Sequence, residues 1–166
     1  MKYLPHTPRN FREIVLADLL RAQRLIERIN DEIDPQFRIA SPEGDWWIGI
    51  TLPDELSERK RYFDLVSDFM ACKNSPAFVL ASELAVPDAV YAIGVSHKEV
   101  LGALSLIQRK PVRFGAVQWL SEAQLGDELP GLLPRGRREL TNGRLAELDR
   151  FFGPNGKFPA VKIGNE

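Results

Sequence analysis

The stretch that decides the fold is DAVYAIGVSHKEVLGALSLIQRKPVRFGAVQWL, residues 88–120. Its first part, residues 89–95, is almost continuously apolar, which is typical of a strand covered on both faces. Ser96 and Glu99 then have the spacing of a capping box, in which two side chains satisfy backbone N–H groups at the start of a helix. Apolar residues follow at helical spacing as far as the next proline, after which residues 112–120 return as a strand. The stretch therefore predicts a β-α-β unit with parallel strands.

A long helix is predicted near the start of the chain, after an extended arm at residues 1–9. Asn10 and Glu13 form a second capping-box pair, and apolar residues recur every three or four positions from there to Ile33. About two dozen helical residues would span roughly 36 Å, the width of a small domain. The broad apolar stripe predicts packing on the domain's own sheet, whereas its seven-residue rhythm leaves a homodimer through this helix as the alternative.

Proline residues divide the rest of the chain into short strands and helices. The expected elements are a hairpin of strands at 37–41 and 47–52, a helix at 54–73, a strand at 77–84 that forms a hairpin with the strand at 89–95, a short helix at 121–125 and a helix at 142–152. A loop is expected at 126–142, and a tail at 153–166 holds an apolar run that predicts an edge strand or a docked extended segment. We therefore expect one α+β domain, with a mixed sheet of about five strands, the long N-terminal helix and two or three further helices.

Composition limits the class of protein. With 44% hydrophobic and 27% charged residues, the 166-residue chain has the make-up of an ordinary globular domain. The formal net charge of −1 gives no overall electrostatic preference for nucleic acid or for an anionic membrane. Cys72 is the only cysteine and there are two histidines, so we expect neither a disulfide within the chain nor a Cys/His metal site. The single cysteine suits the reducing cytoplasm, and no apolar run is long enough to span a bilayer, so the expected location is the cytoplasm and not a membrane.

Two neighbouring tryptophans form the first candidate site. Trp46 and Trp47 stand at the mouth of the first predicted hairpin, and side chains alternate between the two faces of a strand. The two indoles therefore cannot face one core, so one of them would be exposed unless another element covers it. Because exposed aromatic side chains are common anchors of protein interfaces, the pair predicts a partner-binding surface. Burial of one indole, with the other beneath the long helix or the tail, is the alternative.

Basic residues supply two further candidates. The predicted loop contains Arg135, Arg137 and Arg138, which could bind an acidic protein or phosphates, although no aromatic residues alternate with them as in many nucleic-acid sites. The other candidate is the corner after the central strand, where a helix N-terminus would offer N–H groups to an anion. Its residues are Gly94, Ser96, His97 and Lys98. The alternative for this corner is a simple helix cap.

The sequence contains no motif that fixes a reaction. The patterns GxSxG and HExxH and the glycine spacings of a P-loop or a dinucleotide fold are all missing, so we expect no catalytic residue and no cofactor. By elimination, we expect a non-catalytic cytoplasmic module for protein interaction or regulation. The alternative is a small-molecule- or anion-binding domain, or a transferase-like enzyme, centred on residues 94–98. A nucleic-acid-associated accessory protein is the third possibility, against which the net charge argues.

Overall fold

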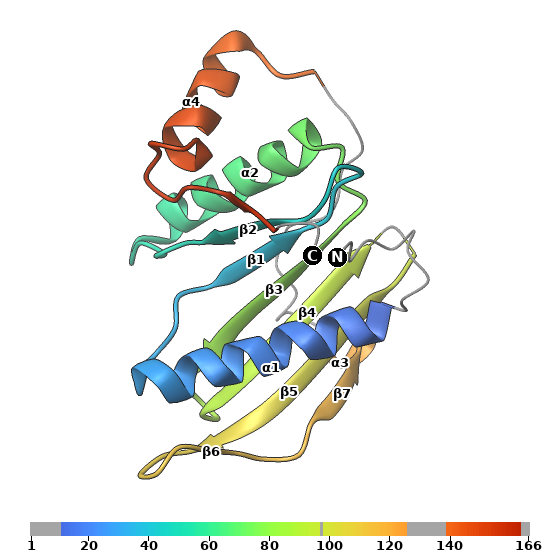
Figure 1. Ribbon diagram of the computed structural model, residues 1–166, viewed down its shortest axis with the longest axis vertical. Helices are drawn as coiled ribbons and strands as arrows, with labels where there is room; N and C mark the ends of the chain where they lie inside the picture. Colours follow the sequence, from blue (N-terminus) through green and yellow to red (C-terminus); the bar gives the residue numbers. More distant parts are fainter. Residues whose placement is uncertain (1–10, 97, 126–138, 164–166) are drawn as a thin grey trace.

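The computed structural model describes residues 11–96, 98–125 and 139–163 (Figure 1). Within these residues, one antiparallel sheet of eight strands is accompanied by four helices. The strands are β1 (Gln36–Ile39), β2 (Trp46–Gly49), β3 (Ala77–Leu84), β4 (Ala89–Ser96), β5 (Val100–Gln108), β6 (Arg113–Phe114), β7 (Gln118–Ser121) and β8 (Val161–Lys162). The helices are α1 (Phe11–Ile29), α2 (Leu56–Cys72), α3 (Glu122–Leu125) and α4 (Asn142–Phe152). Across the sheet the order is β6-β5-β4-β3-β1-β2-β8, and β7 also pairs with β5.

The predicted α+β class and the long N-terminal helix are confirmed. The β1–β2 and β3–β4 hairpins, the helices α2 and α4 and the edge strand β8 also lie where the sequence places them. The sheet differs from expectation, because it has more than five strands and every pairing among the described strands is antiparallel. None of the described helices combines the length and the apolarity needed to cross a bilayer. The predicted arm at 1–9 and most of the predicted loop lie outside the described residues.

The β-α-β unit predicted for residues 88–120 is wrong. Its middle segment is the strand β5 and not a helix, and β5 pairs antiparallel with β4 along most of its length. Ser96 does satisfy nearby backbone groups, since its Oγ accepts hydrogen bonds from the N–H groups of Lys98 (3.2 Å) and Glu99 (3.1 Å). These bonds close a hairpin turn, because a serine can make the same local bonds in a turn and in a helix cap. Long-range pairing with β4 therefore decides the structure of this segment.

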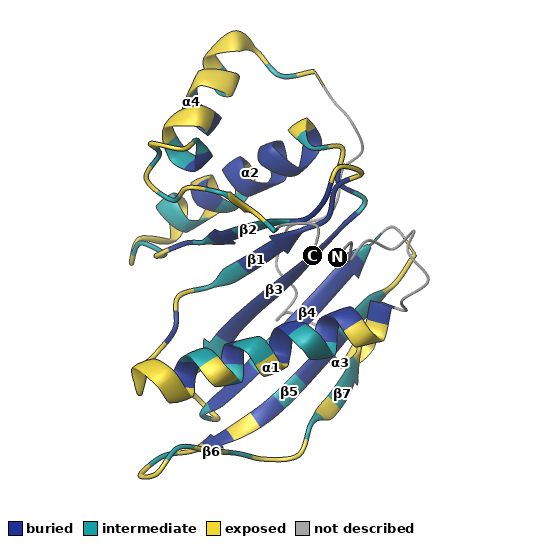
Figure 2. Ribbon diagram, viewed as in Figure 1, coloured by how far each residue is buried: buried dark blue, intermediate teal, exposed yellow. Residues whose placement is uncertain are grey.

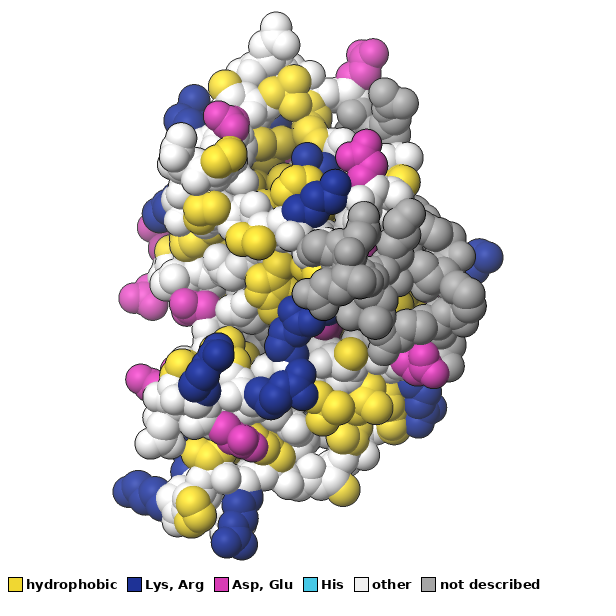
Figure 3. All heavy atoms as spheres, viewed as in Figure 1, with side chains coloured by type: hydrophobic (Ala, Val, Ile, Leu, Met, Phe, Trp, Pro, Cys, Tyr) yellow, Lys and Arg dark blue, Asp and Glu magenta, His cyan; other side chains and the backbone are white. Residues whose placement is uncertain are grey.

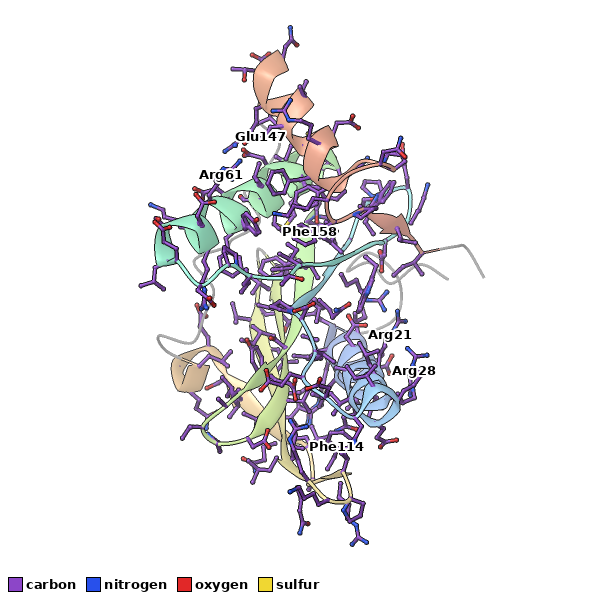
Figure 4. All side chains as sticks on the ribbon, turned by 90° about the vertical axis from the view of Figure 1, so that its left-hand side faces the viewer. Arg21, Arg28, Arg61, Phe114, Glu147 and Phe158 are labelled. Atoms are coloured by element: carbon purple, nitrogen blue, oxygen red, sulfur yellow. The ribbon has the colours of Figure 1, made fainter. Side chains whose placement is uncertain are left out.

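Helices lie on both sides of the sheet. Helix α1 packs mainly on β3, β4 and β5, whereas α2 packs on the opposite face and α4 packs against α2 (Figures 1 and 4). Figure 2 shows the buried residues concentrated in the strands and on the sides of the helices that face them. At Gly94 the helix approaches the sheet so closely that an added Cβ would lie 2.6 Å from Val15 Cγ2. The face beneath α1 is otherwise rich in alanine, namely Ala77, Ala81, Ala92 and Ala103.

Candidate functional site

A groove lies between α1 and the first hairpin, β1–β2. Its volume is about 600 Å³, and its lining includes Arg21, Arg24, Arg28, Gln36 and Trp47. The three arginines are three and four positions apart on α1, so they share one side of the helix over about 10 Å. Figure 3 shows basic side chains gathered over α1, and Figure 4 shows Arg21 and Arg28 projecting from the same side of that helix. We call this feature the arginine groove.

The arginine groove concentrates positive charge on a chain whose formal net charge is only −1. Arg24 and Arg28 are exposed, whereas Arg21 is half-buried. Among the described residues, none of these three arginines forms an ion pair. Like charges at such spacings destabilise a helix by about 0.2–0.5 kcal/mol per pair. An anion bound between the guanidinium groups would relieve this repulsion.

The indole of Trp47 is held in a fixed orientation at the edge of the arginine groove. Its Nε1–H donates a hydrogen bond to Gln36 Oε1 at 2.9 Å, and the residue is half-buried. The guanidinium carbons of Arg21 and Arg38 lie 4.8 Å and 5.6 Å from the centroid of the ring. Cations at these distances are attracted by the aromatic ring. Trp47 therefore joins α1 to the hairpin and sets the shape of the groove.

A buried ionic cluster beneath α1 supports this arrangement. The guanidinium of Arg38 donates from Nε and Nη2 to Asp18 at 2.7–3.0 Å, and from Nη1 to Asp45 at 3.1 Å. Burial by itself would lower the pKa of Arg38, but the hydrogen bonds and charges of Asp18 and Asp45 outweigh burial and raise it. The cluster ties α1 to the strand β1 and to the turn before β2. It therefore fixes the distance across the arginine groove.

The two predicted tryptophans point to opposite faces of β2, as their alternation requires. Trp46 faces α2, where its ring meets Phe69 edge-on at 6.0 Å and the ammonium of Lys73 lies 4.3 Å from the ring centroid. Neither Trp46 nor Trp47 is fully exposed, because other elements cover each of them. Trp47 belongs to the arginine groove, whereas Trp46 belongs to the core between the sheet and α2.

The other predicted site residues do not join the arginine groove. Gly94 lies beneath α1, and Ser96 and Lys98 belong to the β4–β5 turn, so the helix N-terminus expected to bind an anion is not formed there. His97 lies outside the described residues. The same is true of the three predicted loop residues, Arg135, Arg137 and Arg138.

Further charged clusters within the described residues are internally paired. Arg109 contacts Asp88 and Glu83, each at 2.8 Å, at the end of the sheet near the β3–β4 turn. Arg144 joins α4 to α2 through Asp68 at 2.5 Å. No group of three or more His, Cys, Asp or Glu side chains suited to a metal ion is found in the described part of the chain. These clusters are explained by structural roles and leave the arginine groove as the best candidate site.

Sequence reasoning missed the arginines of the groove. Arg21, Arg24 and Arg28 lie on the polar side of an amphipathic helix, where basic residues are usually only solvated. The buried cluster is easier to detect in the sequence, because Asp18 interrupts the apolar stripe of α1 and Arg38 interrupts an apolar strand. Comparison of the chain with protein-family models, with curated proteins and with solved structures gave no match. The functional proposal for this chain therefore rests on the geometry of the groove.

Proposed function

We propose that this protein is a non-catalytic interaction module that binds an acidic segment of a partner protein in the arginine groove. The observation that carries the proposal is the row of Arg21, Arg24 and Arg28, which lack acidic partners among the described residues. Guanidinium groups bind carboxylates through paired hydrogen bonds, and arginine and tryptophan often supply most of the energy at protein interfaces. A cytoplasmic setting belongs to the proposal, because a single cysteine suits a reducing compartment.

Apolar residues in the groove support a peptide over a small inorganic anion. Ala22, Leu25 and Ala81 line it together with the arginines. Ala22 and Ala81 are buried, so the half-buried Leu25 and Trp47 offer the apolar surface on which an acidic peptide could place apolar side chains while its carboxylates reach the guanidinium groups. Burial of apolar surface contributes roughly 25 cal/mol per Å², which a phosphate or sulfate ion alone cannot gain.

Nucleic acid fits the arginine groove less well than an acidic peptide. Sites for single-stranded nucleic acid stack successive bases on several aromatic side chains, whereas Trp47 is the one aromatic residue among the described residues that line the groove. Exposed carboxylates directly after α1 would also repel a polyanion that extended beyond the groove. These residues are Asp31, Glu32 and Asp34.

A binding assay with two double variants tests the proposal. Fluorescence anisotropy would follow a labelled peptide rich in glutamate and leucine as it binds the full chain. Arg24→Glu/Arg28→Glu reverses two charges of the groove, whereas Lys60→Glu/Arg150→Glu reverses two exposed charges on α2 and α4. Both double variants change the net charge equally, so only the position of the charges differs. We expect the groove variant to bind about tenfold more weakly, because each reversal replaces an attraction with a repulsion of about 0.2–1 kcal/mol.

The control variant should bind as the original protein does, apart from a small effect that salt removes. Equal weakening by both double variants would show that only overall charge matters and would refute a site in the groove. Titration with single- and double-stranded DNA and RNA completes the test. Displacement of the peptide by nucleic acid at physiological salt, but not by an uncharged peptide, would make nucleic acid the ligand instead.

A further inference from the structure

Part of the sheet face on which α1 lies carries no described helix. Helix α1 packs mainly on β3, β4 and β5, and its Asp18 covers Arg38 of β1, so the part of this face that carries no described helix is made by β2, β8 and the Gln36 end of β1 (Figure 1). Trp47 and Gly49 face this side, since they are two positions apart on β2. Val161 of β8 lies directly opposite Trp47 in the register and is 60% exposed. We call this surface, made by Gln36, Trp47, Gly49 and Val161, the shelf.

The shelf has the width of one helix. Neighbouring strands are about 4.8 Å apart, so the axes of β1 and β8, with β2 between them, lie roughly 10 Å apart. An α-helix with its side chains is about 10–12 Å across, and packed helices lie about 8–10 Å apart. A second helix would therefore fit beside α1, with the arginine groove between the two helices.

An extended peptide would be poorly satisfied on this surface. The backbone groups of β1 and β2 that pair with each other point along the sheet and not out of its face. A strand that lay on the shelf would find no backbone partners there, whereas a helix satisfies its own N–H and C=O groups. A helical segment can thus cover the shelf with fewer unsatisfied backbone groups than an extended one.

The positive charge of the arginine row constrains the sequence of a helix that could bind on the shelf. Arg21, Arg24 and Arg28 form a row of about 10 Å along the edge of the shelf, with spacings of three and four residues. We infer that the partner segment is an amphipathic α-helix that lies along α1, with apolar residues on Trp47 and Val161 and acidic residues facing the arginine row. This inference rests on the proposed function and adds the conformation and the sequence pattern of the partner.

Two peptides of identical composition test the inference. In one peptide, leucine and glutamate occupy separate faces of a helix; in the other, the order is shuffled so that no apolar face forms. The phased peptide should bind the full chain about tenfold more tightly and should become helical on binding, as measured by anisotropy and by carbon chemical shifts of the labelled peptide. Equal affinity for the two peptides, or an extended bound conformation, would overturn a helical partner.

Two valine variants locate the binding surface. Val161→Asp places a carboxylate on the shelf, whereas Val86→Asp places the same group on the β3–β4 turn, where Val86 is 92% exposed. We expect Val161→Asp to weaken the phased peptide about tenfold and Val86→Asp to leave its affinity unchanged, with equal unfolding temperatures as the check on folding. Equal affinity of the two variants would overturn the shelf. If Val161→Asp does not weaken binding but Arg24→Glu/Arg28→Glu still weakens the binding of both peptides, the proposed function stands and only the helical partner is refuted.

Discussion

Replacing Arg38 with methionine should strongly destabilise the protein. The Arg38 side chain is 2% exposed and lies between Asp18, which is 1% exposed, and Asp45, which is 0% exposed. Methionine keeps most of the apolar length of arginine but removes the guanidinium. Asp18 would then lose the guanidinium that donates three hydrogen bonds to it, and burial of a charge without its partner is costly.

The expected loss is about 3–5 kcal/mol, the range found when one partner of a buried ion pair is removed. A domain of this kind has roughly 5–15 kcal/mol of total stability, so the variant should lose a large share of it. The matched control is Arg61→Met, because Arg61 is 43% exposed and pairs with Glu58 and Glu147 at the surface. Such surface pairs contribute little to stability, because water and salt screen them.

Urea unfolding at neutral pH, followed by circular dichroism, would measure both variants. If Arg38→Met is too unstable to fold, Asp18→Asn/Arg38→Met should recover part of the loss, because a neutral amide replaces the buried Asp18 carboxylate. An Arg38→Met protein as stable as Arg61→Met would refute the account of the buried cluster. So would a double variant that is less stable than Arg38→Met alone.

Other parts of the fold give further expectations. Gly94→Val should lower the unfolding temperature, since its side chain would collide with Val15, and overpacking of this kind costs about 1–3 kcal/mol. Hydrogen bonds from Arg61 and Arg144 lower the pKa of Glu147, so its contribution to stability is present above the usual glutamate pKa of about 4.3 and is lost as the pH falls through the lowered value. The stability difference between the original protein and Glu147→Gln should therefore shrink in acid, as urea unfolding at several pH values would show. Because the apolar stripe of α1 is buried on the sheet, sedimentation should find a monomer, and a dimer at micromolar concentration would restore the helix-mediated homodimer.

Local sequence patterns were sufficient to predict most of the helices and strands. The apolar stripe of α1 has one period throughout, and the turns of the β1–β2 and β3–β4 hairpins are marked by proline, glycine or aspartate. In each case the propensity of the segment agrees with its long-range contacts. Agreement between local and long-range preferences is what makes an element readable from sequence.

The segment of β5 shows why the remaining fold could not be read in the same way. Its apolar residues fit both a helical and a strand pattern, and Ser96 can cap a helix or close a turn. The pairing of β5 with β4 and β7 decides between them, and those contacts are not visible in the local sequence. A β-hairpin in place of a crossover helix also explains why the sheet is antiparallel and not mixed.

The candidate site was predicted in part. Trp47 was singled out because two adjacent tryptophans on a strand cannot share one face. The sequence did not single out its neighbours Arg21, Arg24 and Arg28. Their place beside Trp47 depends on the position of α1, which is set by the small residues beneath that helix and by the Asp18–Arg38 pair. The arginine groove is thus a product of helix placement and not of a sequence motif.

The indole N–H signal of Trp47 offers the most direct test of binding in the arginine groove. Its Nε1–H donates to Gln36 at the edge of the groove, and Trp47→Phe would assign the signal in a ¹H–¹⁵N spectrum. Addition of the phased acidic peptide should shift the Trp47 signal in step with binding. The signal of Trp119, a residue of β7 whose ring lies against Arg12 of α1, should stay in place. A Trp47 signal that does not move when the peptide is fully bound would contradict binding in the groove.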